Sequence, residues 1–200
     1  MRWDRFFEDL EGQLDSEWEA ERAALDSEAE RLRMSRLALR ERLQALRAGS
    51  DARVGFELCD GQVVAGVLTS VGTDWAGMTP VDATGPGPVI VSLPAVATLT
   101  LAEGDLLGSA RASQVVPRGL AERMTLGYLL RDLARRRIAV TMHLRGGRTL
   151  GGTIDRALSD HLDLALHDVG EPRRASAVSG MRVLPFAAIA WLHLESSARL

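Results

Sequence analysis

Apolar residues recur at seven-residue spacing along the first fifty positions, in a segment that contains no proline. Sustained spacing of this kind with charged flanks is typical of a coiled coil, and Gly49 followed by Ser50 would end the helix. We therefore predict one long helix over residues 3–47. Its expected oligomerisation stripe consists of Leu14, Trp18, Leu25, Leu32, Leu39, Leu43 and Leu46. The alternative is an amphipathic helix that packs on its own domain.

Charge is unevenly distributed along this predicted helix. Acidic residues dominate up to Glu30, and arginines dominate from Arg31 to Arg47. This order suits the helix dipole, and it would also let two copies pair in antiparallel orientation. Glu21 and Glu28 interrupt the apolar seam.

A second pattern occurs twice, over residues 54–75 and 140–162. In each copy an apolar segment is followed by a glycine, a second apolar segment with an internal glycine, and an aspartate. The matching positions keep one constant offset, which indicates an internal repeat. They are Leu58, Gly61, Gly66, Leu68 and Asp74 in the first copy and Leu144, Gly147, Gly152, Ile154 and Asp160 in the second. A Leu-Pro step follows in each copy, at residues 93 and 184.

The glycines suggest how each copy folds. Asp60-Gly61 and Gly146-Gly147 favour two-residue hairpins, for which a type I′ turn needs positive φ at both positions. Gly66 and Gly152 lie inside apolar segments, where glycine marks a bend or a close backbone approach. A third strand should begin near residue 74, and two more should cover residues 89–93 and 95–101 after a loop at 82–88.

Residues 102–118 form a polar connection, and residues 120–137 have the apolar spacing of a helix. The repeated unit is therefore a helix followed by a small barrel. We expect an α+β fold of two tandem five-stranded β-barrels, each preceded by a helix, the first of them long and coiled-coil-like. The expected segments are a helix at 1–49, a barrel at 51–101, a linker and helix at 102–137, and a barrel at 138–195.

This arrangement of a turn glycine, a bend glycine and an aspartate opening the third strand resembles the Sm-like family of small barrels. Related SH3-like barrels have similar patterns, and the layout also resembles uncharacterised actinobacterial two-barrel proteins. Sm-like proteins assemble into rings through outer barrel strands and bind RNA, so the resemblance implies both properties. The chain departs from the family at the RNA pocket, because Trp75 and His161 stand near its asparagine and Leu-Pro replaces its Arg-Gly step.

The composition of the chain limits the classes of function that we expect. The formal net charge is −3, so the chain as a whole is not a polycation, and all 24 basic residues are arginine. The single cysteine, Cys59, excludes an internal disulfide. The start of the chain lacks the apolar run of a signal peptide, and no segment has the apolar length of a membrane span. We expect a cytoplasmic protein without membrane contact.

Enzymatic chemistry is not indicated. Gly146–Gly152 lacks the lysine of a phosphate-binding loop, and Cys59 has no evident activating base. His161, Asp163 and His167 share one face of a predicted strand, but the two histidines would lie roughly 20 Å apart at about 3.3 Å per residue, too far to share a metal. We read them as solvent-facing residues and expect no catalytic residues, cofactor or metal.

Arginines gather in the second repeat, where they could bind phosphate groups through counterion release. These residues are Arg131, Arg135, Arg136, Arg137, Arg145, Arg148, Arg173 and Arg174. Our leading interpretation is an Sm-like regulatory protein that contacts RNA or DNA through the second helix and barrel. The alternative is a protein-interaction or oligomerisation scaffold without nucleic-acid binding, indicated by the heptad helix and the aromatic residues Trp3, Phe6 and Phe7. We expect a homo-oligomer formed through the N-terminal helix or the barrel edges.

Overall fold

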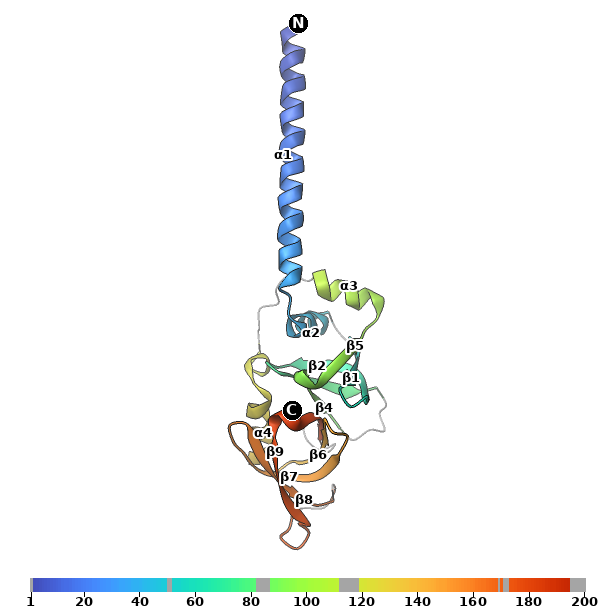
Figure 1. Ribbon diagram of the computed structural model, residues 1–200, viewed down its shortest axis with the longest axis vertical. Helices are drawn as coiled ribbons and strands as arrows, with labels where there is room; N and C mark the ends of the chain where they lie inside the picture. Colours follow the sequence, from blue (N-terminus) through green and yellow to red (C-terminus); the bar gives the residue numbers. More distant parts are fainter. Residues whose placement is uncertain are drawn as a thin grey trace. The chain divides into compact units, whose positions relative to one another are not determined.

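The structure is a computed structural model that describes residues 2–49, 52–81, 87–111, 119–168, 170 and 173–194. The side chains of residues 2–7, 9–11 and 15 lie outside this description, and with them the aromatic residues near the N-terminus. Helices and antiparallel strands make the described fold α+β (Figure 1). The chain divides into two compact units, Met1–Ala38 and Leu39–Leu200.

Two helices occupy the segment for which we predicted one. Helix α1 covers Arg2–Ser35 and helix α2 covers Leu39–Ala48. Between them the backbone turns at residues 36–38, where the amides of Arg36 and Leu37 donate to carbonyls three residues earlier. The prediction of a single helix to residue 47 is therefore wrong. Leu43 and Leu46 of α2 are buried.

Ten antiparallel strands form one continuous sheet in the order β5-β1-β2-β3-β4-β10-β6-β7-β8-β9. The strands are β1 (Arg53–Leu58), β2 (Val63–Val71), β3 (Trp75–Pro80), β4 (Val89–Ser92), β5 (Val96–Thr100), β6 (Ala139–Leu144), β7 (Thr149–Ala157), β8 (His161–Leu166), β9 (Gly180–Pro185) and β10 (Ile189–Leu194). The predicted pair of closed five-stranded barrels is thus wrong. Strands β4 and β10 pair with each other, which joins the two halves, and the sheet stays open with β5 and β9 at its edges.

The internal repeat is visible in the strand order of each half. In the first half the fifth strand lies beside the first, followed by the second, third and fourth; in the second half β10 lies beside β6, followed by β7, β8 and β9. The register also repeats, because β1–β2 and β6–β7 pair Val54 with Gly66 and Val140 with Gly152. The halves therefore share one topology.

The hairpin turns differ from the predicted type. Gly61 and Gly147 have φ of 81° and 78°, but the residues before them do not have positive φ. In the first hairpin the Gly61 amide donates to the Leu58 carbonyl, and the Leu58 amide donates to the Gln62 carbonyl. These bonds define a three-residue loop in which a type I turn is followed by a left-handed glycine, a common alternative to type I′.

The fifth strands show that the two Leu-Pro steps do not correspond. Each fifth strand follows a 3-10 turn, Leu93–Ala95 before β5 and Phe186–Ala188 before β10. Pro94 lies within the first of these turns, whereas Pro185 ends strand β9. The longer loop between β8 and β9 adds residues to the second copy, which shifts the offset between matching positions in its last two strands.

Each half has its own hydrophobic core. Helix α2 contacts β2 and closes the first core, and helix α4 (Leu126–Arg135) contacts β7 and closes the second. The cores interlock at the join, because Trp75 and Ile90 of the first half belong to the second core and Ala190 of the second half belongs to the first. The two halves are thus packed together as well as paired by backbone.

The connection between the halves contains more structure than predicted. Helix α3 covers Glu103–Arg111, within the segment that we expected to be irregular. The helix expected at 120–137 is a 3-10 turn, Ala121–Arg123, followed by α4, which Thr125 caps through its hydroxyl oxygen. Parts of the predicted loops at 82–88, 102–118 and 169–180 lie outside the described residues.

Candidate functional site

The join between the halves is the first candidate site, and the pairing of β4 with β10 forms its backbone. Trp191 lies opposite Val91, Leu192 opposite Ile90, and His193 opposite Val89. Strand β10 also pairs with β6, which places Trp191 opposite His143. The strand alternation sends Leu192 into the second core and Trp191 toward the first.

Three rings gather on the outer face of β6 and β10. The rings of His143 and Trp191 stack with centroids 3.7 Å apart and planes 5° apart. His193 lies 5.6 Å from His143 and 5.8 Å from Trp191, in tilted orientations. Our sequence analysis did not single out this cluster, although the alternation of Trp191, Leu192, His193 and Leu194 is the signal from which one face could have been read.

Burial sets the electrostatics of this cluster. Desolvation lowers the pKa of His143, the neighbouring His193 lowers it further, and the carboxylate of Asp60 partly opposes both effects. Desolvation also lowers the pKa of His193. Both imidazoles are therefore held in the neutral form. Within the described residues, Nε2 of His143 and Nε1 of Trp191 are buried without a hydrogen-bond partner, which fits a packing role for the cluster.

Asp74 and Trp75, at the start of β3, hold the helix of the second half. The Leu126 amide, at the start of α4, donates to Oδ1 of Asp74 at 2.6 Å. Nε1 of Trp75 donates to the Met124 carbonyl at 3.0 Å, and the Thr73 amide donates to the same carbonyl. The first repeat therefore binds the N-terminal end of α4, the helix that belongs to the second repeat.

Asp160 and His161 occupy the matching positions in the second half. The backbone geometry is the same, because the Phe186 amide donates to the Asp160 carbonyl as the Leu93 amide donates to that of Asp74. The side chains differ: the Asp160 carboxylate is 84% exposed and pairs with Nδ1 of His161 at 2.7 Å. This hydrogen bond lowers the pKa of Asp160. In the second half the pair therefore holds no helix within the described residues.

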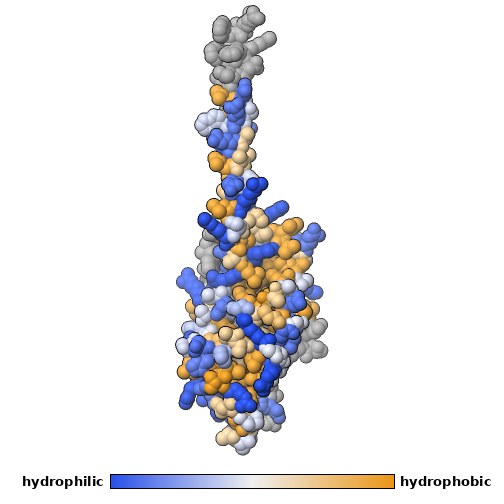
Figure 2. Space-filling view, viewed as in Figure 1, coloured by the Kyte–Doolittle hydropathy of each residue, from blue (hydrophilic) through white to orange (hydrophobic). Residues whose placement is uncertain are grey.

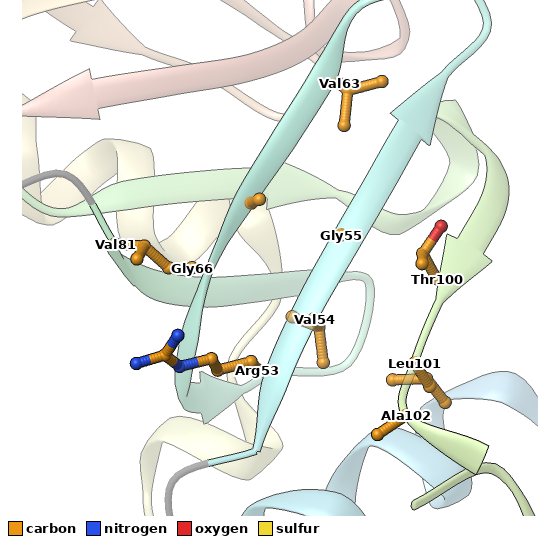
Figure 3. Close-up of a pocket in the computed structure, with 10 residues that line it drawn as sticks. Arg53, Val54, Gly55, Val63, Gly66, Val81, Thr100, Leu101 and Ala102 are labelled. Carbon is orange, nitrogen blue, oxygen red and sulfur yellow. The ribbon is translucent and has the colours of Figure 1, made fainter.

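The free edges of the sheet are the second candidate site. Strand β9 exposes Met181 and Val183, with 49% and 65% of their surface accessible. Beside β5 lies an open groove of about 430 Å³ on the outer face of β1 and β2 (Figure 3). Its lining is mainly apolar and includes Val63, Val81 and Thr100, with the Arg53 side chain at its rim.

The groove matches a covered surface on the second half. We aligned the strand pair β1–β5 of the first half with the pair β6–β10 of the second half. In this alignment Gly55 corresponds to Thr141, and Thr100 corresponds to His193. On the second half this surface lies beside the join, where Trp191 packs against the first core. On the first half the same surface is an exposed groove.

Four of the eight arginines predicted to bind phosphate are paired with carboxylates. Arg135 and Arg136 pair with Asp132 at 2.5 and 3.4 Å. Arg137 and Arg173 converge as expected, but both pair with Asp155, at 3.0 and 2.6 Å. Arg137 also has φ of 55°, the left-handed conformation of a helix terminus.

The other predicted arginines are scattered. Arg131 donates to the Leu158 carbonyl at 2.9 Å, and Nε of Arg145 is buried without a partner among the described residues. Arg148 and Arg174 are exposed. The eight arginines therefore do not form one continuous cationic surface.

The predicted oligomerisation stripe is divided between two environments. Leu14, Trp18, Leu25 and Leu32 of α1 are exposed by 48–64%. Leu39 begins α2 and is 41% exposed, whereas Leu43 and Leu46 are buried in the first core. For α2, the alternative of an amphipathic helix on its own domain is the observed one.

Other candidate chemistry is weak. His167 is buried rather than solvent-facing: Nδ1 donates to the Asp168 carbonyl, so Nε2 accepts from the Thr153 hydroxyl. Among the described residues, no cluster of three or more metal-ligating side chains is present. Cys59 is a free, exposed thiol. In the described part of the chain, no helix combines the length and apolarity needed to cross a membrane.

Comparison with known proteins gave no match, whether with protein-family models, curated proteins or solved structures.

Proposed function

We propose that this protein is a non-enzymatic assembly protein whose copies join head to tail through strands β9 and β5. The observation that supports this proposal is the pairing of β4 with β10, which joins the two halves of the chain. There the fourth strand of one repeat pairs with the fifth strand of the next, and the same two kinds of strand lie at the two ends of the sheet, each with one neighbour among the described strands. An open edge with an exposed backbone is a template for pairing with another chain, and such a head-to-tail contact can be repeated.

The internal join supplies a register for the proposed contact. When β3 and β4 are aligned with β8 and β9, Val89 corresponds to Arg182 and Val91 corresponds to Leu184. When β6 and β10 are aligned with β1 and β5, Trp191 corresponds to Thr98 and His193 corresponds to Thr100. Between copies, Leu184 would then lie opposite Thr98, and Arg182 opposite Thr100. The groove beside β5 would be covered in the same way as the cluster beside β10.

The same alignment gives Asp160 and His161 a role. Within the chain, Asp74 and Trp75 bind the start of α4, the helix of the next repeat. The next repeat after the second half would belong to another copy, and its helix is α2. We expect Asp160 to accept from backbone amides at the start of that α2, and His161 to donate to a carbonyl just before it. Both side chains are polar and accessible, which suits this contact.

The resemblance to Sm-like proteins, which assemble through outer strands, is compatible with this proposal. Nucleic-acid binding through the second repeat is less well supported, because Asp132 and Asp155 already oppose four of the arginines. A basic surface that neutralises phosphates would give binding that weakens with salt. We therefore favour the scaffold over the RNA- or DNA-binding regulator.

Sedimentation tests the proposal. We expect the wild type to sediment as an oligomer of 21.7 kDa chains and Val183→Asp to reduce the mass sharply, because a charge on the edge strand opposes pairing. Leu120→Asp is the matched control, since Leu120 is 74% exposed and belongs to none of the ten strands. A monomeric wild type at tens of micromolar, or equal masses for the two variants, would refute the proposal. Salt-dependent binding of mixed-sequence RNA would instead support the regulator.

A further inference from the structure

The described side chains in the middle of helix α1 are exposed. Every residue from 16 to 32 is exposed, and apolar side chains (orange) are interspersed with polar ones along it (Figure 2). At 34 residues the helix is about 51 Å long at 1.5 Å per residue. Helices in proteins gain most of their stability from packing an apolar face, so α1 is expected to bind a partner.

The seam of α1 identifies the chemistry of that partner. Leu14, Trp18, Leu25 and Leu32 follow coiled-coil spacing, and the seam positions between them are Glu21 and Glu28. Each seam residue inserts among residues of the facing helix, where an unpaired carboxylate is costly. Glu28 has only a loose exposed contact with Arg31, at 3.9 Å. A partner with arginine or lysine facing these two glutamates would neutralise them.

A second copy of α1 does not meet this requirement. In a parallel pair Glu21 would face Glu21, and in an antiparallel pair the seam glutamates would face leucine or tryptophan. Three of the six arginines expected to balance the acidic half are also engaged outside α1. Arg40 donates to the Gly72 and Glu122 carbonyls, Arg42 donates to the Leu106 carbonyl, and Arg47 pairs with Glu122. Residues 2–35 alone contain eleven acidic residues and five arginines, a formal charge of −6.

We propose that α1 binds a helix of a different protein that has apolar residues at heptad spacing and basic residues opposite Glu21 and Glu28. The site is separate from the sheet edges, so it does not depend on the proposed assembly. The acidic surface of α1 would also attract such a basic helix and would repel other copies of α1.

Two synthetic helical peptides test this proposal with the full chain. Both have leucine at heptad spacing; one has arginine and the other glutamate at the two positions that would face Glu21 and Glu28. Fluorescence anisotropy should show the arginine peptide binding about tenfold more tightly or better. Glu21→Gln combined with Glu28→Gln should remove most of this preference, and Glu19→Gln combined with Asp26→Asn, the same charge change off the seam, should keep it.

Equal binding of the two peptides, or no binding of either, would overturn the proposal. Self-association that disappears in Leu25→Asp combined with Leu32→Asp would also overturn it, because the second copy would then be the partner. Loss of mass in Val183→Asp alone concerns the sheet edge, so the two proposals fail independently.

Discussion

Gly66 and Gly152 lie where the neighbouring strand leaves no room for a side chain. A Cβ at Gly66 would overlap the Thr79 carbonyl oxygen, and one at Gly152 would overlap the Ala165 carbonyl oxygen. The obstacle is backbone in both cases, so relief would require the paired strands to separate. The sequence suggested a bend or a close backbone approach at these glycines, and the structure shows the close approach.

We predict that Gly66→Val and Gly152→Val each lower the free energy of unfolding by more than the ~1 kcal/mol span of strand propensities. The physical reason is the overlap with the opposite carbonyl. Urea unfolding followed by circular dichroism measures the change. Gly104→Ala is a suitable control, because nothing lies within 4 Å of a Cβ at that position. Wild-type unfolding curves for both valine variants would contradict the prediction.

Asp74 and Asp160 are matched positions, and we expect Asp74 to affect the stability of the chain and Asp160 to affect assembly between copies. Asp74→Ala removes the acceptor of the Leu126 amide, and loss of a helix N-terminal acceptor costs about 0.5–2 kcal/mol. Asp160→Ala removes an exposed carboxylate, so the melting temperature of the chain should stay close to that of the wild type while the oligomer weakens. Thermal melting and sedimentation of both variants separate the two effects. The idea fails if Asp160→Ala leaves the oligomer mass unchanged.

His143 and His193 should make stability depend on pH. Their folded-state pKa values lie below the ordinary value of 6.5, so the unfolded chain binds more protons as the pH falls through that value. Stability should be fully present above about pH 7 and decline toward pH 5.5. His143→Gln and His193→Gln should flatten this decline in melting temperature. A melting temperature that rises on acidification would show the opposite sign.

At the scale of elements, helix boundaries were the least predictable feature. Residues 36–38 contain no proline or glycine, so nothing local marks the break between α1 and α2. After the break, α2 buries Leu43 and Leu46 in the first core, which is a tertiary contact. Helix α3 was missed because Gly104 and Gly108 suggested a loop. Strand positions were predicted well, since alternation and turn glycines are local signals.

The division of the leucine stripe has a measurable consequence. Leu43 is fully buried in the first core, so Leu43→Ala should cost about 2–5 kcal/mol of stability. Leu25 is 64% exposed on α1, and Leu25→Ala should change stability by no more than about 0.5 kcal/mol. Chemical unfolding of the two variants compares them directly. Similar losses would mean that α1 is packed like α2.

At the scale of the whole molecule, the repeat was readable from the sequence but the join was not. Matching glycines and aspartates have fixed spacing, whereas the pairing of β4 with β10 links residues about a hundred positions apart. Two separate barrels satisfied every local signal equally well. Likewise, the pairing of Asp132 with Arg135 and Arg136 follows from helical spacing, whereas Asp155 became evident as the partner of Arg137 and Arg173 only through folding.

Cysteine crosslinking between copies tests the proposed assembly most directly. Thr100 and Arg182 are exposed, and the internal join predicts that they lie opposite each other between copies. Opposed residues in antiparallel strands have Cα atoms about 4.5–5.5 Å apart, within the range of a disulfide. In a Cys59→Ser background, we expect a mixture of Thr100→Cys and Arg182→Cys chains to form disulfide-linked dimers under mild oxidation. Thr98→Cys mixed with Arg182→Cys, two residues out of register, should crosslink much less. Equal crosslinking of both mixtures, or none in either, would contradict head-to-tail pairing of β9 with β5.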